Sequence, residues 1–408
     1  MLGNGFDLHY KLPTKYINFL NTVEQLYYLY KTKPESLTDV HSIGDLFGSE
    51  RLQRNDAFIT DSYQAYQKNY DLIGISFDII ETLARLPETN MWCVYLLKSL
   101  NRDIGWIDFE KEIGTVLSCF EKILGEKEVS ILSSRNLLNR QERYIIEQFN
   151  FFIENKTNYV SGIPVSSEKI KKEYSVEYPV GSKVYIINDD LIINTLDKEL
   201  KALADALKMY LSSFVESVAK SLIKERKIGL SSLFSYTDKV ITLNYTNIYE
   251  SFAPQASVIH IHGETGSNIV LGINANSRDE LDGIDTSCLV FKKYYQRVLY
   301  SLDLEYIRFL LQATKNNIRI SLSIMGHSLD ITDKEIISDL FSLAKEIRII
   351  YHSQHALAAY ISNLVKIFGK DGFDALRYEK DLKFISIEKD CDQYLGDQGF
   401  NHFEEAFS

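Results

Sequence analysis

Four short segments of the sequence carry residues whose types and spacing suit chemistry on a nucleotide. They are Gly3-Asn4-Gly5-Phe6-Asp7, Asn244-Tyr245-Thr246, His260-Ile261-His262-Gly263 and Gly326-His327-Ser328-Leu329-Asp330. A Gly-x-Gly turn that opens a helix lets backbone N–H groups face a phosphate. Asp7 follows that turn and can accept a ribose hydroxyl or a backbone N–H. The same turn also fits an ordinary tight bend with an Asp cap.

Asn244 and His262 are the candidate catalytic residues. Asn244 follows an apolar run, and its amide can orient a ribose or a water, or can cap the loop. His260 and His262 alternate along one strand. A histidine at a strand end can act as a general base near neutral pH, whereas two on one face could hold a metal. A third interpretation gives both a structural role, which we favour for His260.

Two further motifs leave alternatives open. Gly326-His327-Ser328-Leu329-Asp330 is similar to the nucleophile elbow of serine hydrolases, but Asp330 stands where the elbow needs a glycine. We therefore favour a strand-end loop that faces a phosphate or a ribose. The carboxylates of Asp108, Glu110 and Glu112 could serve as acid and base or bind a metal, although the acidic first turn of a helix explains them more simply.

The elements that must position these residues follow from hydrophobic periodicity. Thr14 is expected to cap a helix that begins near Tyr16, and the pattern stays mostly helical from about residue 50 to 230, with a loop and hairpin expected over 162–190. Short apolar runs then alternate with helical stretches. The runs predicted as strands are KVITLNY (239–245), SVIHIHG (257–263), NIVLGI (268–273), IRISLSIMG (318–326), IRIIYH (347–352) and KFISIEK (383–389).

This alternation predicts an α/β fold with a mostly parallel sheet flanked by helices. Residues 1–30 and 236–408 are expected to form one α/β unit, and residues 31–235 a mainly helical insertion. Ligands of such sheets bind at the carboxyl ends of the strands, so the four segments are expected to converge there. Only Met1-Leu2 precedes the glycine turn, so we expect weaker nucleotide binding than in a chain with roughly five to eight further apolar residues.

Composition narrows the class of protein. The 408 residues carry a net charge of -11, which argues against broad binding to nucleic acid. Cys93, Cys119, Cys288 and Cys391 lie far apart, which is typical of reduced thiols in a cytoplasmic protein. No apolar run approaches the ~20 residues of a membrane helix.

Together, GNGFDLHYKLPTKY, LNYTNIYE, IHIHG and MGHSLDITD resemble the AbiH family of bacteriophage abortive-infection proteins and, more distantly, the sirtuin-like, Rossmann-like NAD-binding fold. The resemblance implies that Gly3, Asn4 and Gly5 cradle a pyrophosphate. It places Phe6 and Asp7 beside the nicotinamide ribose, and it makes Asn244 and His262 catalytic. The further cofactor-binding residues that it implies are Pro13, Thr246, Gly326, His327, Ser328 and Asp330.

The resemblance also implies a function. Thr246 replaces an acid of the sirtuins, and zinc-ribbon cysteines are lacking, so protein deacylation is not implied. We expect an abortive-infection protein that hydrolyses NAD, its substrate, to nicotinamide and ADP-ribose without a metal. The alternatives are a noncatalytic nucleotide sensor that signals through the helical insertion, and a serine- or metal-dependent hydrolase. Expected partners are a phage-derived trigger or partner protein and a second copy of the chain, but neither a membrane nor nucleic acid.

Overall fold

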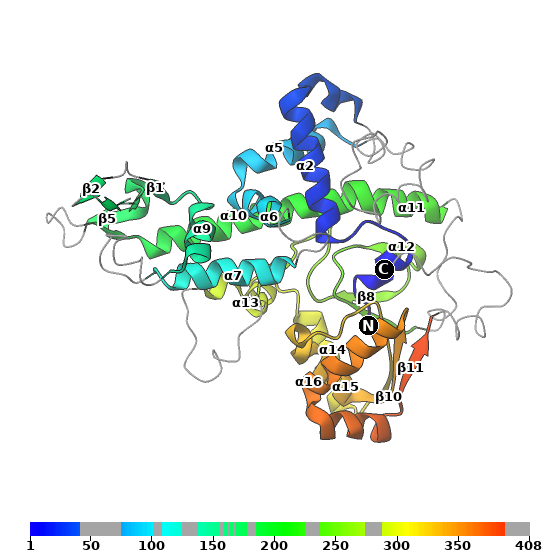
Figure 1. Cartoon of the computed structure of the whole chain (residues 1–408). Helices are drawn as coiled ribbons and strands as arrows, with labels where there is room; N and C mark the ends of the chain where they lie inside the picture. Colours follow the sequence, from blue (N-terminus) through cyan, green and yellow to red (C-terminus); the bar gives the residue numbers. More distant parts are fainter. Residues whose placement is uncertain are drawn as a thin grey trace.

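The computed structural model describes residues 1–40, 75–100, 108–124, 138–154, 158–160, 163–165, 168–177, 185–224, 237–273 and 288–387. Figure 1 shows an α/β part, which holds the later strands, below a helical part crossed by one long helix. Alternation of β-branched strands with amphipathic helices produces the first part, because each strand buries both faces and each helix buries one.

The main sheet contains five strands and a short central segment. The strands are β7 (Lys239–Thr242), β8 (Ser257–His260), β9 (Ile320–Met325), β10 (Ala344–Tyr351) and β11 (Leu382–Ser386). Leu2 bridges Thr242 on one side and Met325 on the other, both in parallel. The order across the sheet is therefore β11, β10, β9, Leu2, β7 and β8, and every pairing is parallel.

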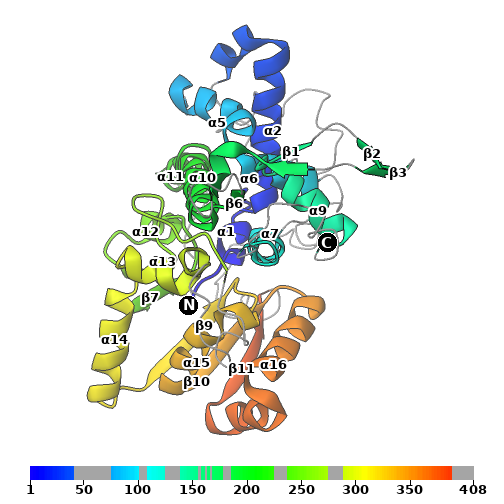
Figure 2. The ribbon, with the colours of Figure 1, turned by 90° about the vertical axis from the view of Figure 1, so that its left-hand side faces the viewer.

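Side chains that alternate along the strands divide between two hydrophobic cores. Leu322, Ile324, Ile347 and Ile349 pack with the helices that follow β8, β9 and β10. These helices are α14 (Leu304–Lys315), α15 (Lys334–Leu343) and α16 (Gln354–Glu379). Figure 2 shows α14, α15 and α16 beside the strands. The parallel sheet flanked by helices was predicted; its relation to the sirtuin-like fold stays a prediction.

The opposite face of the sheet packs against α1 (Gly5–His9), α12 (Ile248–Phe252) and the helical part. Leu2, Val240, Met325 and Ile350 belong to one core with residues of the helices between positions 16 and 224. This shared core joins the α/β unit to the helical part, although their separation into residues 1–30 plus 236–408 and residues 31–235 stays a prediction.

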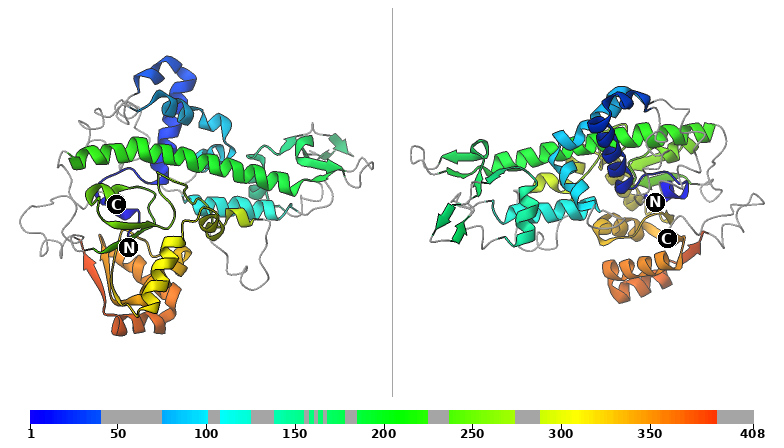
Figure 3. Two further views of the ribbon diagram at one scale, coloured as in Figure 1. Left: turned by 180° about the vertical axis from the view of Figure 1, so that it is seen from behind. Right: turned by 45° about the horizontal axis from the view of Figure 1, so that its top comes forward.

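The helical part is built around α10 (Asp189–Tyr210), which continues through a π-helical segment, η4 (Leu211–Glu216), into α11 (Ser217–Lys224). Figure 3 shows this rod crossing above the α/β part. Its other helices are α2 (Tyr16–Thr32), η1 (Pro34–Asp39), α5 (Phe77–Thr89), α6 (Met91–Leu100), α7 (Phe109–Glu121) and α9 (Arg140–Glu147).

Short strands form antiparallel pairs at one end of the rod. They are β1 (Phe152–Glu154), β2 (Asn158–Val160), β3 (Ile163–Val165), β4 (Glu168–Ile170), β5 (Ser175–Glu177) and β6 (Tyr185–Ile187), with η3 (Lys172–Tyr174) between β4 and β5. The pairs β1–β4, β2–β3 and β5–β6 are antiparallel. The strands β3 to β6 lie in the stretch predicted as a loop and hairpin, whereas β1 and β2 precede it, in a stretch predicted to be helical.

Two local predictions are wrong. The NIVLGI run forms only isolated bridges, from Ile269 to Gly263 and from Ile273 to Lys292, because it follows a turn instead of entering the sheet. Helix α2 is capped at Lys15, whose N–H donates to the side chain of Asn18. The hydroxyl of Thr14 instead donates to Asn4 Oδ1 at 2.6 Å.

Three short elements complete the α/β part. Between β8 and α14 the chain forms η6 (Leu289–Phe291) and α13 (Lys293–Leu299), and η7 (Ile331–Asp333) follows β9.

Candidate functional site

A cavity of about 270 Å³ opens at the carboxyl ends of the strands, and we call it the strand-end cavity. The segments that follow Leu2, β7, β8 and β9 all contribute to it, although more than 300 residues of sequence separate the first from the last. It is lined by Gly3, Asn4, Asp7, Thr14, Tyr16, Glu110, Leu207, Leu211, Leu243, Asn244, Tyr245, Thr246, His262, Lys293, Gly326, His327, Ser328 and Asp333.

Most of the residues predicted from the sequence as site residues line this cavity. They are Gly3, Asn4, Asp7, Asn244, Thr246, His262, Gly326, His327 and Ser328. The fold therefore brings the four segments together, as expected from parallel strands whose carboxyl ends share one edge. That these residues contact a ligand stays a prediction.

Four predicted site residues do not line the cavity. Phe6 is 1% exposed and packs edge-on against Tyr10, with ring centroids 5.3 Å apart, because its apolar ring is buried in the core beneath α1. The carbonyl of Pro13 accepts a hydrogen bond from Tyr210 at 2.8 Å. Asp330 caps η7 by accepting from the N–H of Thr332 at 3.0 Å.

The fourth, Gly5, belongs to a contact between two backbones. The N–H of Gly5 donates to the carbonyl of Gly326 at 2.8 Å, and that of Gly3 donates to Met325 at 3.0 Å. Gly326 has a φ of 69°, and a Cβ there would lie 2.2 Å from the nitrogen of Phe6. These glycines let the first turn touch the turn after β9. Two of the three amides expected to cradle a pyrophosphate are thus already bonded.

Asp7 is a buried carboxyl at the cavity wall and is 1% exposed. Its Oδ2 accepts a hydrogen bond from the hydroxyl of Thr246 at 2.5 Å. Oδ1 is buried and makes no hydrogen bond of good geometry to any residue that the structure describes. Burial raises the pKa of Asp7 to about 7, although hydrogen bonds from Thr246 and Asn244 favour the ionised form. Asp7 therefore changes charge near neutral pH.

His262 is 5% exposed and lies beside Asp333, with 3.8 Å between Nε2 and Oδ1. Burial, reinforced by the positive charge of Lys293, lowers the pKa of His262 to about 3. Its imidazole is therefore neutral at physiological pH. An efficient general base has a pKa near the working pH, so this environment does not favour the base role predicted for His262.

Asp333 organises the neighbouring His327. The Nδ1 of His327 accepts from the N–H of Leu329 at 2.9 Å, so its Nε2 carries the proton and donates to Asp333 Oδ2 at 3.1 Å. Burial would raise the pKa of Asp333, but the bond from His327 and the charge of Lys293 hold it well below its usual range. Both nitrogens of His327 are thus in use.

A buried ion pair joins the two parts of the molecule inside the cavity wall. Lys293 starts α13, its side chain is 3% exposed, and its Nζ lies 2.5 Å from Oε1 of Glu110 on α7. Burial would lower the pKa of Lys293, but the charges of Glu110 and Asp333 raise it above its usual value. Lys293 and Asp333 were not predicted from the sequence as site residues, whereas Glu110 belongs to the acidic cluster of Asp108, Glu110 and Glu112.

The acidic cluster near residue 110 performs separate tasks. Asp108 caps α7 through the N–H groups of Glu110 and Lys111, as the simpler interpretation predicted. Glu112 accepts from the hydroxyl of Tyr95 at 2.5 Å. Only Glu110 reaches the cavity, so these carboxylates do not act as a pair.

His260 stabilises the loop that carries Asn244. Its Nδ1 lies 3.0 Å from the carbonyl of Asn244, and its Nε2 lies 2.6 Å from Glu250. Burial would lower the pKa of His260, but the bond to Glu250 and that carboxylate's charge raise it. His260 and His262 therefore face different partners, and no group of three His, Cys, Asp or Glu suited to a metal occurs within the described residues.

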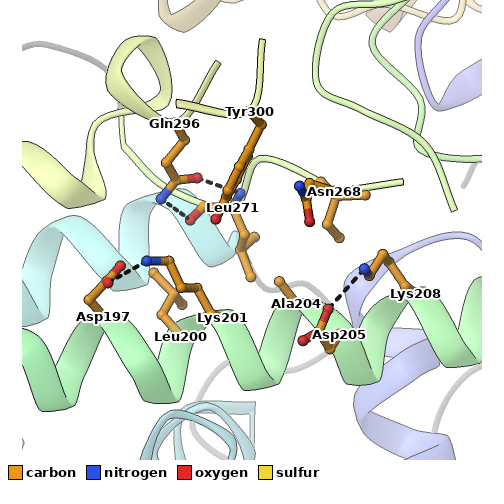
Figure 4. Close-up of a pocket in the computed structure, with 11 residues that line it drawn as sticks. Asp197, Leu200, Lys201, Ala204, Asp205, Lys208, Asn268, Leu271, Gln296 and Tyr300 are labelled. Atoms are coloured by element: carbon orange, nitrogen blue, oxygen red, sulfur yellow. Dashed lines mark hydrogen bonds and ion pairs between the residues drawn. The ribbon is translucent and has the colours of Figure 1, made fainter. Parts of the chain in front are cut away.

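A second hollow of about 350 Å³, which we call the α10 groove, is lined by residues of α10 and by Asn268, Ile269 and Leu271 of the 262–271 segment. Figure 4 shows its charged residues along one face of α10, where Lys201 pairs with Asp197 at 2.6 Å and Lys208 with Asp205 at 2.9 Å. Gln296 closes the opposite wall by bonding both the N–H and the carbonyl of Leu271.

These observations define an α/β protein with a polar, partly charged cavity at the carboxyl edge of a parallel sheet. A family model described as "Bacteriophage abortive infection AbiH" matches residues 1–352, and the chain belongs to this family. Family membership indicates a role in abortive infection by bacteriophage. Neither the curated proteins nor the solved structures contain a match to the chain.

Two general features accompany this assignment. The helices within the described residues include none with the length and apolar character needed to cross a membrane. Cys93, Cys119 and Cys288 are buried and take part in no disulfide among the described residues, and Cys391 lies outside them.

Proposed function

We propose that this AbiH-family protein binds NAD or a related nucleotide in the strand-end cavity and hydrolyses NAD to nicotinamide and ADP-ribose. One observation carries the proposal, the position of the cavity in the order of the strands. In chain order the sheet reads 6-5-4-1-2-3, with Leu2 in place of the first strand. Doubly wound sheets of this order bind dinucleotides where the order reverses, between the first and fourth strands. Gly3 and Asn4 follow the first of these, and Gly326 to Ser328 follow the fourth.

The charge of the lining supports the cleavage of this particular bond. Asp7, Glu110 and Asp333 face the cavity together with one amine, that of Lys293. An excess of carboxylates favours a cationic pyridinium and the oxocarbenium character that develops when a glycosidic bond breaks. At about 270 Å³ the cavity suits the nicotinamide ribose, with the rest of the dinucleotide outside it. The Asn244 amide is suited to orient the ribose or the water.

The test is turnover by the full chain. Purified protein is incubated with NAD, with and without an extract of phage-infected bacteria, and nicotinamide is quantified by chromatography. We expect turnover to fall in Asn244→Ala and to stay unchanged in the matched control Asn316→Ala, which is exposed at the end of α14. Nicotinamide release by His262→Ala is likewise compared with that by the control His355→Ala, which is exposed. Wild-type turnover in Asn244→Ala would reject the assignment of the site.

A noncatalytic nucleotide sensor is the second candidate, and a different observation favours it. Glu110, Leu207 and Leu211 belong to the predicted helical insertion and, together with Tyr16 of α2, line the same cavity. A bound nucleotide would therefore contact the helical part directly. Thermal stabilisation by NAD without nicotinamide release, in the presence of the phage extract as well, would favour this function over hydrolysis.

A further inference from the structure

We propose that Asp7, and not His262, accepts the proton of the attacking water in this reaction, an inference that rests on the proposed hydrolysis. Water attacks C1′ of the nicotinamide ribose, and the bond from C1′ to the pyridinium nitrogen breaks. The electron pair of that bond neutralises the pyridinium, so nicotinamide leaves. The water proton passes to Oδ1 of Asp7, which later releases it to solvent. ADP-ribose, nicotinamide and one proton result.

The position of the two carboxyl oxygens is the first argument. The hydroxyl of Thr246 bonds Oδ2 at 2.5 Å and holds the carboxyl in one orientation. The Asn244 amide also interacts with the Asp7 carboxyl and lowers its pKa. Oδ1 nevertheless makes no hydrogen bond of good geometry to the described residues, and the side chain lines the cavity. Buried acceptors are nearly always bonded, so Oδ1 keeps a lone pair that a water or a ligand hydroxyl brought into contact with it would fill.

The state of the other titratable groups in the cavity is the second argument. Oε1 of Glu110 is bonded to Lys293, and Asp333 is bonded to His327. The Nδ1 of His327 already accepts from Leu329. The environment of His262 keeps it neutral and weakly basic. Burial raises the pKa of Glu110 as well, but its carboxylate is held in the ion pair with Lys293. Asp7 combines a buried oxygen without a well-formed hydrogen bond with a pKa near neutrality.

The electrostatic surroundings agree with this role. Burial raises the pKa of Asp7 to about 7, near the value that suits a base at neutral pH. Glu216 on η4 raises this pKa further, whereas Thr246, Asn244 and the charge of His260 on β8 lower it. Removal of the bond from Thr246 should therefore raise the pKa of Asp7 without removing its carboxyl.

The experiment compares pH profiles of NAD hydrolysis and NAD binding for the wild type, Asp7→Asn and Thr246→Val, with Asp371→Asn as an exposed control on α16. Asp7→Asn keeps the shape of the side chain and can still bond Thr246. We expect its kcat to fall by about 10²–10⁴, the usual contribution of a general base, while calorimetry gives a Kd for NAD near that of the wild type. In Thr246→Val we expect the midpoint of the kcat profile to move to higher pH. Asp371→Asn should match the wild type in both measurements.

The possible outcomes distinguish a failure of the role proposed for Asp7 from a failure of the proposed NAD hydrolysis. If the wild type hydrolyses NAD and Asp7→Asn does so equally, or if the Thr246→Val midpoint stays in place, Asp7 is not the proton acceptor and the hydrolase assignment stands. If Asp7→Asn does not bind NAD, the carboxyl serves binding and the inference fails. If the wild type itself neither binds nor cleaves NAD, both proposals fall.

Discussion

The strand-end cavity and the α10 groove border the same 262–271 segment, yet they hold their charges in opposite ways. In the groove, Lys201 and Lys208 pair with acids three or four residues away on the same helix, and their side chains are 45% and 21% exposed. In the cavity, Lys293 is 3% exposed and pairs with an acid from a helix 183 residues away. Exposed pairs stabilise a protein little, whereas buried charges alter both stability and pKa.

The largest expected effect breaks the buried pair. Lys293→Met leaves Glu110 and Asp333 without their cation, so we expect the free energy of unfolding to fall by about 4 kcal/mol, as when one partner of a buried pair is removed. Lys201→Met in the α10 groove should cost at most about 0.5 kcal/mol because its pair faces water. Urea unfolding measures both. If the free energy of unfolding fell equally in Lys293→Met and Lys201→Met, the ion pair in the cavity would stabilise the protein no more than the exposed pair in the groove.

The next effect concerns the pH dependence of stability. Burial raises the pKa of Asp7 from 3.8 to about 7, so the folded state holds the carboxyl proton more tightly than the unfolded state does. The protonated carboxyl therefore stabilises the folded state fully below pH 3.8, and this contribution is lost as the pH rises through about 7. From about pH 4 to about pH 8 we expect the wild type to lose roughly 2–4 kcal/mol relative to Asp7→Asn. Asp205→Asn, whose side chain is 60% exposed in the groove, should follow the wild type. Parallel curves for wild type and Asp7→Asn would contradict the buried carboxyl.

The smallest effect tests the backbone contact in the cavity wall. An alanine at Gly326 would have a strained φ and a Cβ 2.2 Å from the nitrogen of Phe6, so we expect a loss of about 2 kcal/mol in unfolding free energy. Gly266 lies in a turn of the 262–271 segment, and a Cβ added there would have its nearest neighbour at 3.9 Å, so Gly266→Ala should be neutral. Thermal melts measured side by side check this, and a neutral Gly326→Ala would show that the two turns can separate without cost.

Local patterns predicted most of the sheet and part of the site. Short runs of apolar, β-branched residues identified β7 to β11. A buried parallel strand is such a run, so it can be recognised from its own residues without knowledge of the strand it pairs with. The same criterion failed for NIVLGI, whose apolar residues are buried in the core without sheet pairing. Asn244 and His327 were recognised because polar residues at a strand end are unusual.

Residues that act through distant partners escaped prediction. Lys293 reads as an ordinary helix residue, and Asp333 as part of a helix start. Phe6 was placed beside a ligand because of its position next to the glycine turn, but its ring turns into the core. Nothing in the spacing of residues shows which face of a five-residue helix meets the cavity.

The sequence by itself determined the parallel α/β sheet, the four strand-end segments and membership of the AbiH family. Periodicity is set by neighbouring residues, and the motifs and their order are read directly along the chain. The tertiary structure alone decided the charge states, since burial and partners from other elements set them. It made Asp7, and not His262, the group that titrates near neutral pH. It also brought Glu110 of the helical part to Lys293 at the sheet edge.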